Sequence, residues 1–449
     1  MKYDVIIVGA GTGGCATALT LGKSGLNVAI LDSKKQQKIG DKVCGDFIDP
    51  AYFRKIRDMG VNLKDPEYGK IVVKKLKGFL FIPPSRKNML KLDLGSERWV
   101  LDRYVFGQSL LKNVIDEGVD LIDQCKVVTP IVENNALKGV TVKHKGEKKN
   151  IQADVCVDAS GFHAVIRKQL NPQKTYMDRN ILNKDTCLAY REIRTLATDI
   201  EDSDYSHLIF DPDNVPGGFI WMIPREERVV NVGLGVHLGL RRPPRLRKLF
   251  GEILSNNPIF RGSTVIKAGG WRIPLRRPID TCVWNNLLLV GDAGSHVKPT
   301  DGEGIGFSMQ AGIMAGKTIV KAHELGSFSR NSLWHYNVLI MKVIGLVNGP
   351  LELGKREIIN LTSKQVQDLF DSSILDAEEL YHLNSGNKLN FGTIELLKKL
   401  WKGKKMLPFL LRLRKTIKNM KKAKKIYLEY PESFDGFLQW KNKIEHLYR

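Results

Sequence analysis

Three glycines near the N-terminus have the spacing of a phosphate-binding turn. Gly9, Gly11 and Gly14 form the pattern G-x-G-x-x-G. The first glycine of such a pattern allows a tight turn, the second lets the backbone approach a pyrophosphate, and the third lets a helix pack closely on a strand. Asp32 follows Gly11 by roughly 20 residues, where a carboxylate can accept hydrogen bonds from ribose hydroxyls. These residue types predict that the chain binds a dinucleotide.

The segments around these residues are those that a dinucleotide site requires. The pattern predicts a buried parallel strand over Tyr3–Val8, a helix of small residues over Cys15–Lys23, and a second strand over Asn27–Leu31 that ends at Asp32. The N-terminus of the helix would offer unpaired N–H groups and a partial positive charge to the phosphates. Because all these segments occur in order, a dinucleotide site is favoured over a purely structural βαβ turn. The glycines alone do not distinguish FAD from NAD.

Further motifs along the chain carry a family resemblance. They are Asp102-Arg103, Asp158-Ala159-Ser160-Gly161 with Arg167, Gly291-Asp292-Ala293 with Gly302-Glu303-Gly304-Ile305, Cys44-Gly45-Asp46, and the run from Pro216 to Pro224 followed by Gly233-x-Gly235. Together with the first glycines, they resemble the FAD-binding pattern of the para-hydroxybenzoate-hydroxylase-like flavoproteins. The last two resemble the geranylgeranyl reductases within that superfamily. The resemblance covers residues 1 to about 330 with specific motifs and the C-terminal third only loosely.

The resemblance implies that FAD is the cofactor. Asp292 would hydrogen-bond a ribityl hydroxyl, and the N–H groups at Gly302–Ile305 would stabilise negative charge on the reduced ring. Arg103 would contact the pyrophosphate or the flavin, with a surface ion pair as the alternative, and the backbone at Val127 would contact adenine. The full implied set is Gly9, Gly11, Gly13, Gly14, Asp32, Cys44, Gly45, Arg103, Val127, Asp158, Gly291, Asp292, Gly302, Gly304 and Ile305. No cysteine or histidine spacing indicates a metal site.

Cys44 and Asp46 are the catalytic candidates. The resemblance places Cys44 beside the flavin, in a loop that contains Lys42 and Asp46. We expect Lys42 to lower the pKa of the Cys44 thiol. Cys44, an ordered water and the N–H groups of the flavin are alternative sources of a proton, and Asp46 or Asp41 would orient the loop or relay that proton. The alternative for Cys44 is a packing role.

Phe219, Trp221 and Pro224 are the expected substrate contacts. Phe219 and Trp221 alternate on one expected strand, so both would face the same side. They form either an ordinary aromatic core pair or the wall of an apolar tunnel over the flavin. A polyprenyl chain needs such a wall, because about 0.8 kcal/mol accrues per buried CH₂. The reductases usually have Tyr where this chain has Phe219 and Phe where it has Ile223, which removes a hydroxyl and widens the tunnel.

The order of expected strands and helices predicts an α/β fold with more than one domain, since 449 residues exceed one compact core. We expect a Rossmann-type FAD-binding domain, an inserted antiparallel β-sheet substrate domain and a helical C-terminal region. The FAD-binding domain would comprise residues 1–70, 98–170 and 280–330. The substrate domain would comprise residues 71–97 and 171–279, and residues 331–449 would form a basic helical domain.

The chain is strongly basic, with a formal net charge of +22 and a sequence pI near 9.6. This charge indicates either an anionic partner or a lysine-rich surface without one. Residues 398–425 contain thirteen Lys or Arg and no Asp or Glu, and Pro408 should divide them into two helices. A basic amphipathic stretch suits an anionic membrane surface. A solvated helix face is the alternative, and no motif for nucleic acid accompanies the charge.

Composition also bounds the location of the protein. No apolar run approaches the roughly 20 residues that span a bilayer, and a strand from residue 3 leaves no room for a signal peptide. The six cysteines show no paired spacing, so reduced thiols are expected. The sequence therefore predicts a cytoplasmic protein that associates peripherally with a membrane.

With the resemblance, these features predict an FAD-dependent reductase that saturates C=C bonds in the geranylgeranyl chains of archaeal membrane ether lipids or their precursors. A hydride from N5 of the reduced flavin would reach one alkene carbon, and a proton the other. The alternatives are an FAD-dependent hydroxylase or epoxidase of an apolar substrate, and a non-catalytic flavin or lipid carrier. The electron donor would be NADPH or a ferredoxin. The basic surface of this chain would suit a ferredoxin, which is an acidic protein.

Overall fold

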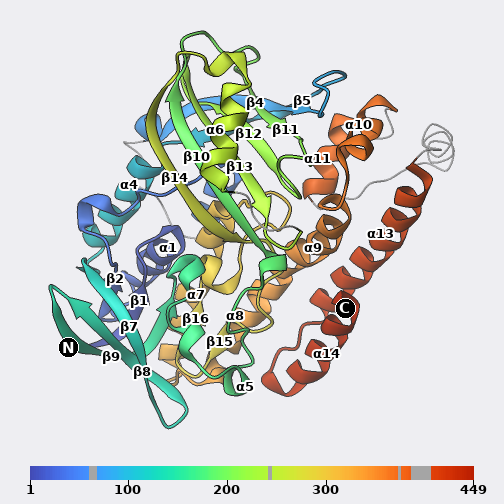
Figure 1. Cartoon of the computed structure of the whole chain (residues 1–449). Helices are drawn as coiled ribbons and strands as arrows, with labels where there is room; N and C mark the ends of the chain where they lie inside the picture. The colour runs from blue at the N-terminus through green and yellow to red at the C-terminus, as the bar shows by residue number, and fades with distance from the viewer. Residues whose placement is uncertain (60–67, 241–244, 373–375, 386–405) are drawn as a thin grey trace.

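The computed structural model describes residues 1–59, 68–240, 245–372, 376–385 and 406–449 (Figure 1). Its strands form two sheets. The first has the order β15-β16-β9-β1-β2-β6, with β7 and β8 attached through β9, and the second has the order β14-β10-β13-β12-β11-β4-β5-β3. Helices cover the first sheet and form the C-terminal region. The predicted α/β fold with an inserted antiparallel sheet and a helical C-terminal region is confirmed.

The first sheet carries the glycine-rich turns. Its strands are β1 (Lys2–Val8), β2 (Val28–Leu31), β6 (Asp120–Ile122), β7 (Cys125–Glu133), β8 (Ala136–His144), β9 (Glu147–Asp158), β15 (Val283–Trp284) and β16 (Leu287–Leu289). β1 pairs in parallel with β2 and β9, and β16 pairs in parallel with β9. The carboxyl ends of these strands therefore meet at one edge of the sheet, where ligands bind in such folds.

Two helices close the first sheet at its centre. α1 (Thr12–Leu21) packs on α7 (Ile305–Glu324). A Cβ on Gly312 would lie 2.3 Å from the carbonyl oxygen of Gly13, so only glycine allows this approach. The contact brings the N-terminal ends of both helices to the same edge of the sheet. Two glycine-rich turns that are about 290 residues apart in the chain thus face one space.

The second sheet consists of β3 (Phe47–Ile48), β4 (Val72–Ile82), β5 (Leu90–Leu101), β10 (Thr186–Thr195), β11 (Tyr205–Ile209), β12 (Phe219–Pro224), β13 (Val229–His237) and β14 (Thr264–Pro274). β10, β12, β13 and β14 pair antiparallel, whereas β11 pairs in parallel with β4. β3 lies within the range expected for the FAD-binding domain, yet it pairs with β5. The segment just before β3 is therefore held by the second sheet.

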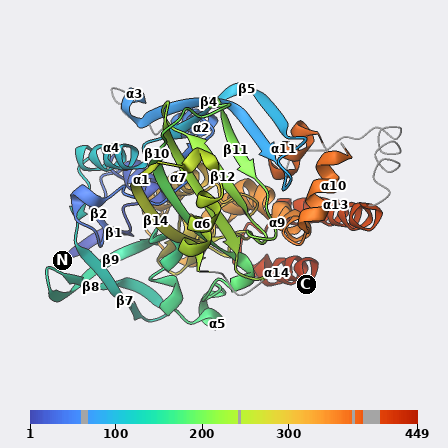
Figure 2. The same cartoon turned by 45° about the horizontal axis from the view of Figure 1, so that its top comes forward.

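The remaining helices are α2 (Ala51–Asp58), α3 (Tyr68–Ile71), α4 (Arg103–Asp116), α5 (Pro172–Thr175), α6 (Leu246–Ser255), α8 (Arg330–Ile340), α9 (Leu346–Ile358), α10 (Ser363–Asp371), α11 (Ala377–Ser385), α13 (Leu407–Leu428) and α14 (Phe437–Tyr448). A π-helical turn, Met341–Gly345, joins α8 to α9. Figures 1 and 2 place α13 and α14 on the side of the molecule opposite β7, β8 and β9.

The basic stretch is described only in part. Pro408 lies in the first turn of α13, where its missing N–H costs nothing. The proline therefore begins a helix, and residues 398–405, the other half of the expected break, lie outside the described residues. Within the described ranges, none of the helices combines the length and the apolar character needed to cross a bilayer.

Candidate active site

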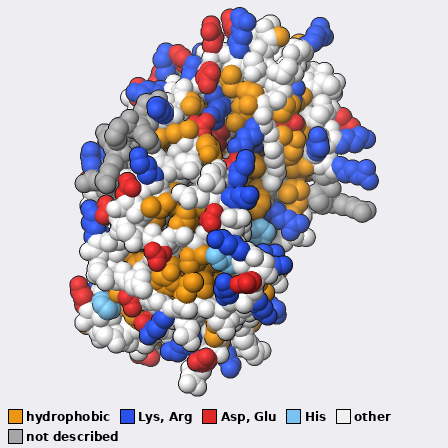
Figure 3. Space-filling view, turned by 90° about the vertical axis from the view of Figure 1, so that its left-hand side faces the viewer, with side chains coloured by type: hydrophobic (Ala, Val, Ile, Leu, Met, Phe, Trp, Pro, Cys, Tyr) orange, Lys and Arg blue, Asp and Glu red, His pale blue; other side chains and the backbone are white. Residues whose placement is uncertain are grey.

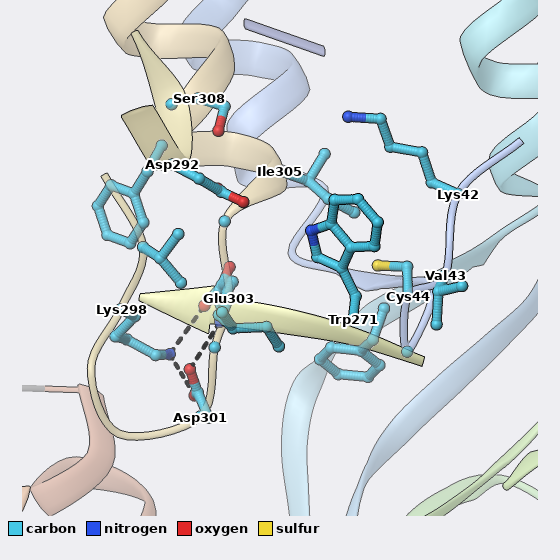
Figure 4. Close-up of a pocket in the computed structure, with 18 of the residues that line it drawn as sticks. Lys42, Val43, Cys44, Trp271, Asp292, Lys298, Asp301, Glu303, Ile305 and Ser308 are labelled. Atoms are coloured by element: carbon cyan, nitrogen blue, oxygen red, sulfur yellow. Dashed lines mark hydrogen bonds and ion pairs between the residues drawn. The ribbon is translucent and has the colours of Figure 1, made fainter. Parts of the chain in front are cut away.

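A cavity of about 1590 Å³ joins the two sheets and the C-terminal helices. The turns after β1, β2 and β16 line one end of this cavity. The loop before β3 and strands β12 and β14 line its middle, and helices α9, α10 and α13 line its other end. Figure 4 is a close-up of the middle part. Most of the predicted cofactor and substrate residues thus lie around one continuous space.

The first glycine turn is built as the sequence pattern requires. Gly9 has φ of +104°, and a Cβ there would lie 2.5 Å from the carbonyl oxygen of Ala159. Gly9, Gly11 and Gly13 line the cavity. Gly14 does not, because its backbone abuts that of Gly9: a Cβ on Gly14 would lie 1.9 Å from the Gly9 oxygen. Gly14 serves helix–strand packing, so its inclusion among the cofactor contacts is corrected.

Asp32 and Val127 lie at the outer end of the same space. Asp32 follows β2, and its carboxylate accepts hydrogen bonds from the N–H groups of Ala10 (2.9 Å) and Lys34 (2.8 Å). These bonds hold the carboxylate beside the glycine turn, where ribose hydroxyls were expected. Val127, in β7, lines the cavity with Cys125 and Lys126. Contact of either residue with the cofactor stays a prediction.

Arg103 offers buried donors to the cavity. It begins α4, which Asp102 caps by accepting hydrogen bonds from two backbone N–H groups. The Nη2 atom of Arg103 donates to Thr12 Oγ1 at 3.2 Å, but its Nε and Nη1 atoms are buried and have no partner among the described residues. Buried donors without acceptors are costly. A pyrophosphate beside the glycine turn would supply the missing acceptors, so the residues present fit a bound dinucleotide.

Asp158 does not line the cavity, and its predicted contact with the cofactor is corrected. The side chain is fully buried, and its Oδ2 atom accepts hydrogen bonds from the N–H groups of Ile166 and Arg167 at 3.0 Å. Its Oδ1 atom accepts from Ser160. The carboxylate thus shapes the loop after β9. Within that loop Ala159, Ser160 and Gly161 line the cavity instead.

The second glycine turn faces the first across the cavity. Gly291 has φ of +67° and Gly302 has φ of +78°, so both occupy left-handed conformations that favour glycine. Gly291, Asp292, Gly302, Gly304 and Ile305 all line the cavity, and Ile305 begins α7. Burial raises the pKa of Asp292, although the nearby Lys42 opposes this shift. The unpaired N–H groups at the start of α7 suit the negative charge of a bound ring.

An ion cluster supports the second turn. Lys298 contacts Asp301 at 2.7 Å and Glu303 at 2.8 Å, and Figure 4 shows the three side chains together below the central space. The Lys298 carbonyl oxygen also accepts a hydrogen bond from the Gly302 N–H at 3.0 Å. These contacts close the loop on itself. The cluster therefore holds the glycine backbone in place at the N-terminus of α7.

The loop with Cys44 is fixed by the second sheet. Asn231, in β13, donates to the Cys44 carbonyl oxygen at 2.9 Å, and Arg191, in β10, donates to the Lys42 carbonyl oxygen at 3.1 Å. Val43 packs against Gly269 in β14, where a Cβ would lie 2.5 Å from the valine side chain. Cys44 and Gly45 thereby line the middle of the cavity.

The Cys44 thiol differs from the sequence expectation. Burial raises its pKa, and the positive charge of Arg103 only partly opposes the shift. Lys42 points away from Cys44 and across the cavity in Figure 4. The Lys42 Nζ atom lies 2.7 Å from where a Cβ on Gly11 would be. The prediction that Lys42 lowers the thiol pKa is wrong, because the lysine reaches the glycine turn; the thiol stays protonated at neutral pH.

Asp46 is buried in a left-handed backbone conformation, with φ of +66°. Its Oδ2 atom accepts hydrogen bonds from Arg225 at 2.7 Å and from Asn231 at 2.8 Å. Its Oδ1 atom is buried and has no partner among the described residues. Burial raises the pKa of Asp46, while Arg191 and Arg225 oppose the shift. Asp46 lines the cavity and couples the Cys44 loop to the second sheet.

Two of the three expected substrate contacts, Phe219 and Trp221, line the cavity, and the third, Pro224, does not. Phe219 and Trp221 both line the cavity, and their ring centres lie 6.3 Å apart. The Trp221 indole donates to Asn231 Oδ1 at 3.0 Å, which fixes its orientation. Pro224 is buried and does not line the cavity, because side chains alternate along β12 and its side chain lies on the other face from Phe219, Trp221 and Ile223. Ile223 is the lining residue beside it.

Several lining or supporting residues were missed from the sequence. Sequence reasoning connected Lys42 with Cys44 and did not single out Trp271. Trp271, in β14, lines the cavity and contacts His163 with ring centres 5.2 Å apart. Arg225 and Asn231 hold Asp46 from the second sheet. No local sequence signal marks Arg225 or Asn231, since their partners are more than 170 residues away.

The family described as FAD binding domain matches residues 2–336, well over half of the chain. The chain belongs to this FAD-binding family. FAD is therefore the cofactor, as the sequence predicted, and the contacts of the two glycine turns and Arg103 with it stay predictions.

Two curated relatives of this FAD-binding protein carry the same kind of name. This chain is 29% identical over 450 residues to the digeranylgeranylglycerophospholipid reductase of Sulfolobus acidocaldarius, and the match covers 100% of this chain and 97% of the relative. It is 28% identical over 413 residues to digeranylgeranylglycerophospholipid reductase 2 of Methanococcoides burtonii, covering 90% and 94%. The predicted resemblance to geranylgeranyl reductases is confirmed, and so is the oxidoreductase class.

Solved structures share the fold. A geranylgeranyl bacteriochlorophyll reductase-like protein of Thermoplasma acidophilum superposes with a TM-score of 0.75 at 21% identity, covering 91% of this chain and 99% of that one. The flavin-dependent brominase Bmp2 superposes with a TM-score of 0.67 at 17% identity, covering 86% and 94%. At these identities the likeness concerns the fold, which thus serves flavin enzymes of different chemistry.

Proposed function

We propose that this protein is an FAD-dependent reductase that saturates C=C bonds in the geranylgeranyl chains of membrane ether lipids or their precursors. One observation carries the proposal: the cavity runs without interruption from the glycine turns and Cys44 to an apolar region walled by aromatic side chains. The relatives' names support the substrate class.

Reduced FAD, when bound, supplies a hydride from its N5 to one alkene carbon. The chain's own residues position the alkene and exclude water. Phe219, Trp221 and Phe210 present ring faces and edges to the substrate region. An isolated alkene has no carbonyl to polarise, so close positioning in a dry site must supply much of the rate.

The proton for the second alkene carbon comes from the Cys44 side of the cavity. A raised pKa keeps the Cys44 thiol protonated at neutral pH, which suits a donor. Asp46 lies two residues further on and is held by Arg225, so its role is to fix the loop. The anionic membrane surface is the proposed source of substrate, and NADPH or an acidic ferredoxin is the proposed electron donor.

Anaerobic turnover tests this proposal. Protein reduced with dithionite under nitrogen should add two hydrogens per double bond to a geranylgeranyl lipid, as read by mass spectrometry. A product that gains oxygen, formed only in air, would identify a monooxygenase. Stoichiometric lipid binding without any product, with every reductant, would identify a carrier. Protein that stays colourless when offered FAD would contradict both flavin-enzyme functions.

A further inference from the structure

One buried histidine holds the second glycine turn from behind. Figure 3 shows histidine side chains at the surface of the molecule, whereas His296 is fully buried and does not line the cavity. The Nδ1 atom of His296 accepts a hydrogen bond from the Gly291 N–H at 3.1 Å. The His296 backbone N–H donates to the Gly291 carbonyl oxygen at 3.0 Å. Both polar groups of the Gly291 backbone are therefore bound to the same residue.

The other side of the imidazole ring contacts a cysteine. The Nε2 atom of His296 lies 3.4 Å from the Cys282 Sγ atom. Because Nδ1 accepts a hydrogen bond, a neutral ring carries its proton on Nε2 and donates a hydrogen bond to the sulfur. Burial lowers the pKa of His296 to about 3, so the ring is neutral at neutral pH. One tautomer of His296 thus joins Gly291 to Cys282.

The backbone around the ring leaves it a single place. A Cβ on Gly294 would lie 2.6 Å from the His296 Nε2 atom, so a residue without a side chain is needed there. The Gly294 carbonyl oxygen accepts a hydrogen bond from the Ile279 N–H at 3.1 Å. The Cys282 Sγ atom lies 3.8 Å from the Ile279 carbonyl oxygen. The segment before β15 and the second glycine turn therefore enclose the imidazole.

The turn that His296 holds presents Asp292 to the cavity. Gly291 and Asp292 both line the cavity, and the φ of Gly291 is +67°. The Asp292 Oδ1 atom lies 3.9 Å from where a Cβ on Gly304 would be, and Figure 4 shows this side chain extending toward Ile305, where α7 begins. Because Asp292 follows Gly291 directly, a shift of the Gly291 backbone would move this carboxylate relative to the N-terminus of α7.

We propose that His296 is a positioning residue for FAD, and that its Nε2–H tautomer keeps the Gly291 turn in the conformation that binds the cofactor. The imidazole acts through Gly291 and Asp292, because it does not line the cavity itself. Without the Nδ1 acceptor, the Gly291 N–H would be a buried donor without a partner, which is costly. The inference depends on FAD as the cofactor but not on a lipid substrate, so its tests need no turnover.

Two amide substitutions at His296 separate hydrogen bonding from packing. The side-chain oxygen of asparagine occupies the position of Nδ1 and can accept from the Gly291 N–H, whereas that of glutamine extends to the position of Nε2. Glutamine is the closer match to histidine in size. If the ring only fills space, His296→Gln should therefore be the better tolerated variant. If the ring positions Gly291, His296→Asn should be the better tolerated variant.

Titration of deflavinated protein with FAD, followed by flavin fluorescence, measures the outcome. We expect His296→Asn to bind FAD within about threefold of the parent and His296→Gln to bind about tenfold more weakly, because a buried donor loses its acceptor. The reduction potential of the bound FAD should also shift in His296→Gln and stay near the parental value in His296→Asn, since a displaced Asp292 would change the charge beside the flavin. A residue that only stabilises the fold would not move this potential.

His237→Gln is the matched control. His237 is also buried, and its Nδ1 atom accepts a hydrogen bond from the Gly239 N–H at 3.4 Å. Neither His237 nor Gly239 lines the cavity, so this variant should bind FAD like the parent. An equal loss of FAD affinity in His237→Gln would overturn the proposal. Tighter FAD binding by His296→Gln than by His296→Asn would overturn it as well and assign the ring to packing.

A second pair of variants tests the tautomer without changing His296. Cys282→Ser keeps an acceptor for the Nε2–H and should bind FAD like the parent, whereas Cys282→Ala removes the acceptor and should weaken binding by about threefold or more. Thermal unfolding of each FAD-free variant shows whether it is folded. Equal FAD affinity in the two variants would contradict the link from Gly291 through His296 to Cys282. If both amide variants of His296 fail to fold, this pair decides.

Discussion

At the scale of single residues, Lys42 and Cys44 are two positions apart and point into different parts of one cavity (Figure 4). Lys42 reaches the first glycine turn, and Cys44 reaches the centre. Hydrogen bonds from β10 and β13 to the carbonyl oxygens of Lys42 and Cys44 fix the backbone and impose this separation. We therefore propose separate roles for the two side chains, Lys42 toward the cofactor phosphates and Cys44 toward the alkene.

Cys44→Ala should retain FAD and lower alkene reduction about 100-fold or more, the usual contribution of a positioned proton donor. The protein's absorption spectrum reads the flavin content, and the rate of product formation reads the activity. Cys125→Ala is the matched control, because Cys125 lines the cavity near Val127 instead. Full activity in Cys44→Ala would remove this thiol from the mechanism.

Lys42→Met should weaken FAD binding by roughly 10- to 100-fold, as expected for loss of a hydrogen bond to a charged group. Titration of deflavinated protein with FAD, followed by flavin fluorescence, measures the affinity. The salt dependence of FAD binding should fall as well, since a contact between opposite charges is lost. Lys38→Met is the control, because Lys38 is exposed and does not line the cavity. Equal affinity in the two variants would refute the role of Lys42.

At the scale of elements, the second sheet acts as the frame of the site. Strand register places Trp221 opposite Gly233. A Cβ on Gly233 would lie 2.3 Å from the Trp221 ring and 2.6 Å from the Arg191 Cβ. The absence of a side chain at Gly233 thus makes room for the indole, whose N–H bonds to Asn231. Backbone pairing and the aromatic wall are therefore coupled.

Gly233→Ala should displace the Trp221 ring and lower the free energy of unfolding by about 1–3 kcal/mol. Urea denaturation followed by tryptophan fluorescence measures both effects. Gly251→Ala should be neutral or stabilising by up to about 1 kcal/mol, because alanine is favoured in an open helix position. A Gly233→Ala protein as stable as the parent would show that the sheet can shift to accept the methyl group.

At the scale of the whole molecule, buried ion pairs attach the C-terminal helices to the FAD-binding part. Asp280 pairs with Arg277 and with Lys441 of α14, the latter at 2.8 Å. The Tyr430 hydroxyl donates to the Asp280 carbonyl oxygen at 2.9 Å. α9 contributes Glu352, which accepts from the Arg277 N–H at 2.7 Å. One wall of the cavity, α9 and α13, is held through this network.

Asp280→Asn should lower the free energy of unfolding at pH 7 by about 3–5 kcal/mol, because two buried cations lose their partner. Burial alone would raise the pKa of Asp280, but Arg277 and Lys441 outweigh it and hold the pKa well below its usual range. A lowered native pKa stabilises the fold fully above the unfolded pKa of about 3.9, and this stabilisation decreases progressively as the pH falls from there toward the native pKa. The two proteins should therefore converge in acid.

Thermal unfolding at pH 7 and near pH 3 measures this effect. Asp199→Asn is the control, since Asp199 forms an exposed pair with Arg228 and should change stability by less than about 1 kcal/mol. A difference between Asp280→Asn and the parent that is the same at both pH values would contradict the assignment of the pKa shift to Asp280.

The sequence by itself determined the turns and the order of the fold. Gly9, Gly291 and Gly302 could be identified from sequence because a left-handed backbone demands glycine locally, wherever the rest of the chain lies. The order of helices and strands and the alternation of Phe219 and Trp221 on one strand are also signals carried by neighbouring residues. Such signals need only neighbouring residues, so they survive without the tertiary structure.

Only the tertiary structure decided where side chains point and what they contact. The Asp158 carboxylate accepts hydrogen bonds from its own loop, and Pro224 does not line the cavity. The Lys42 side chain extends to Gly11. Each outcome depends on packing between segments far apart in the chain, which no local pattern encodes.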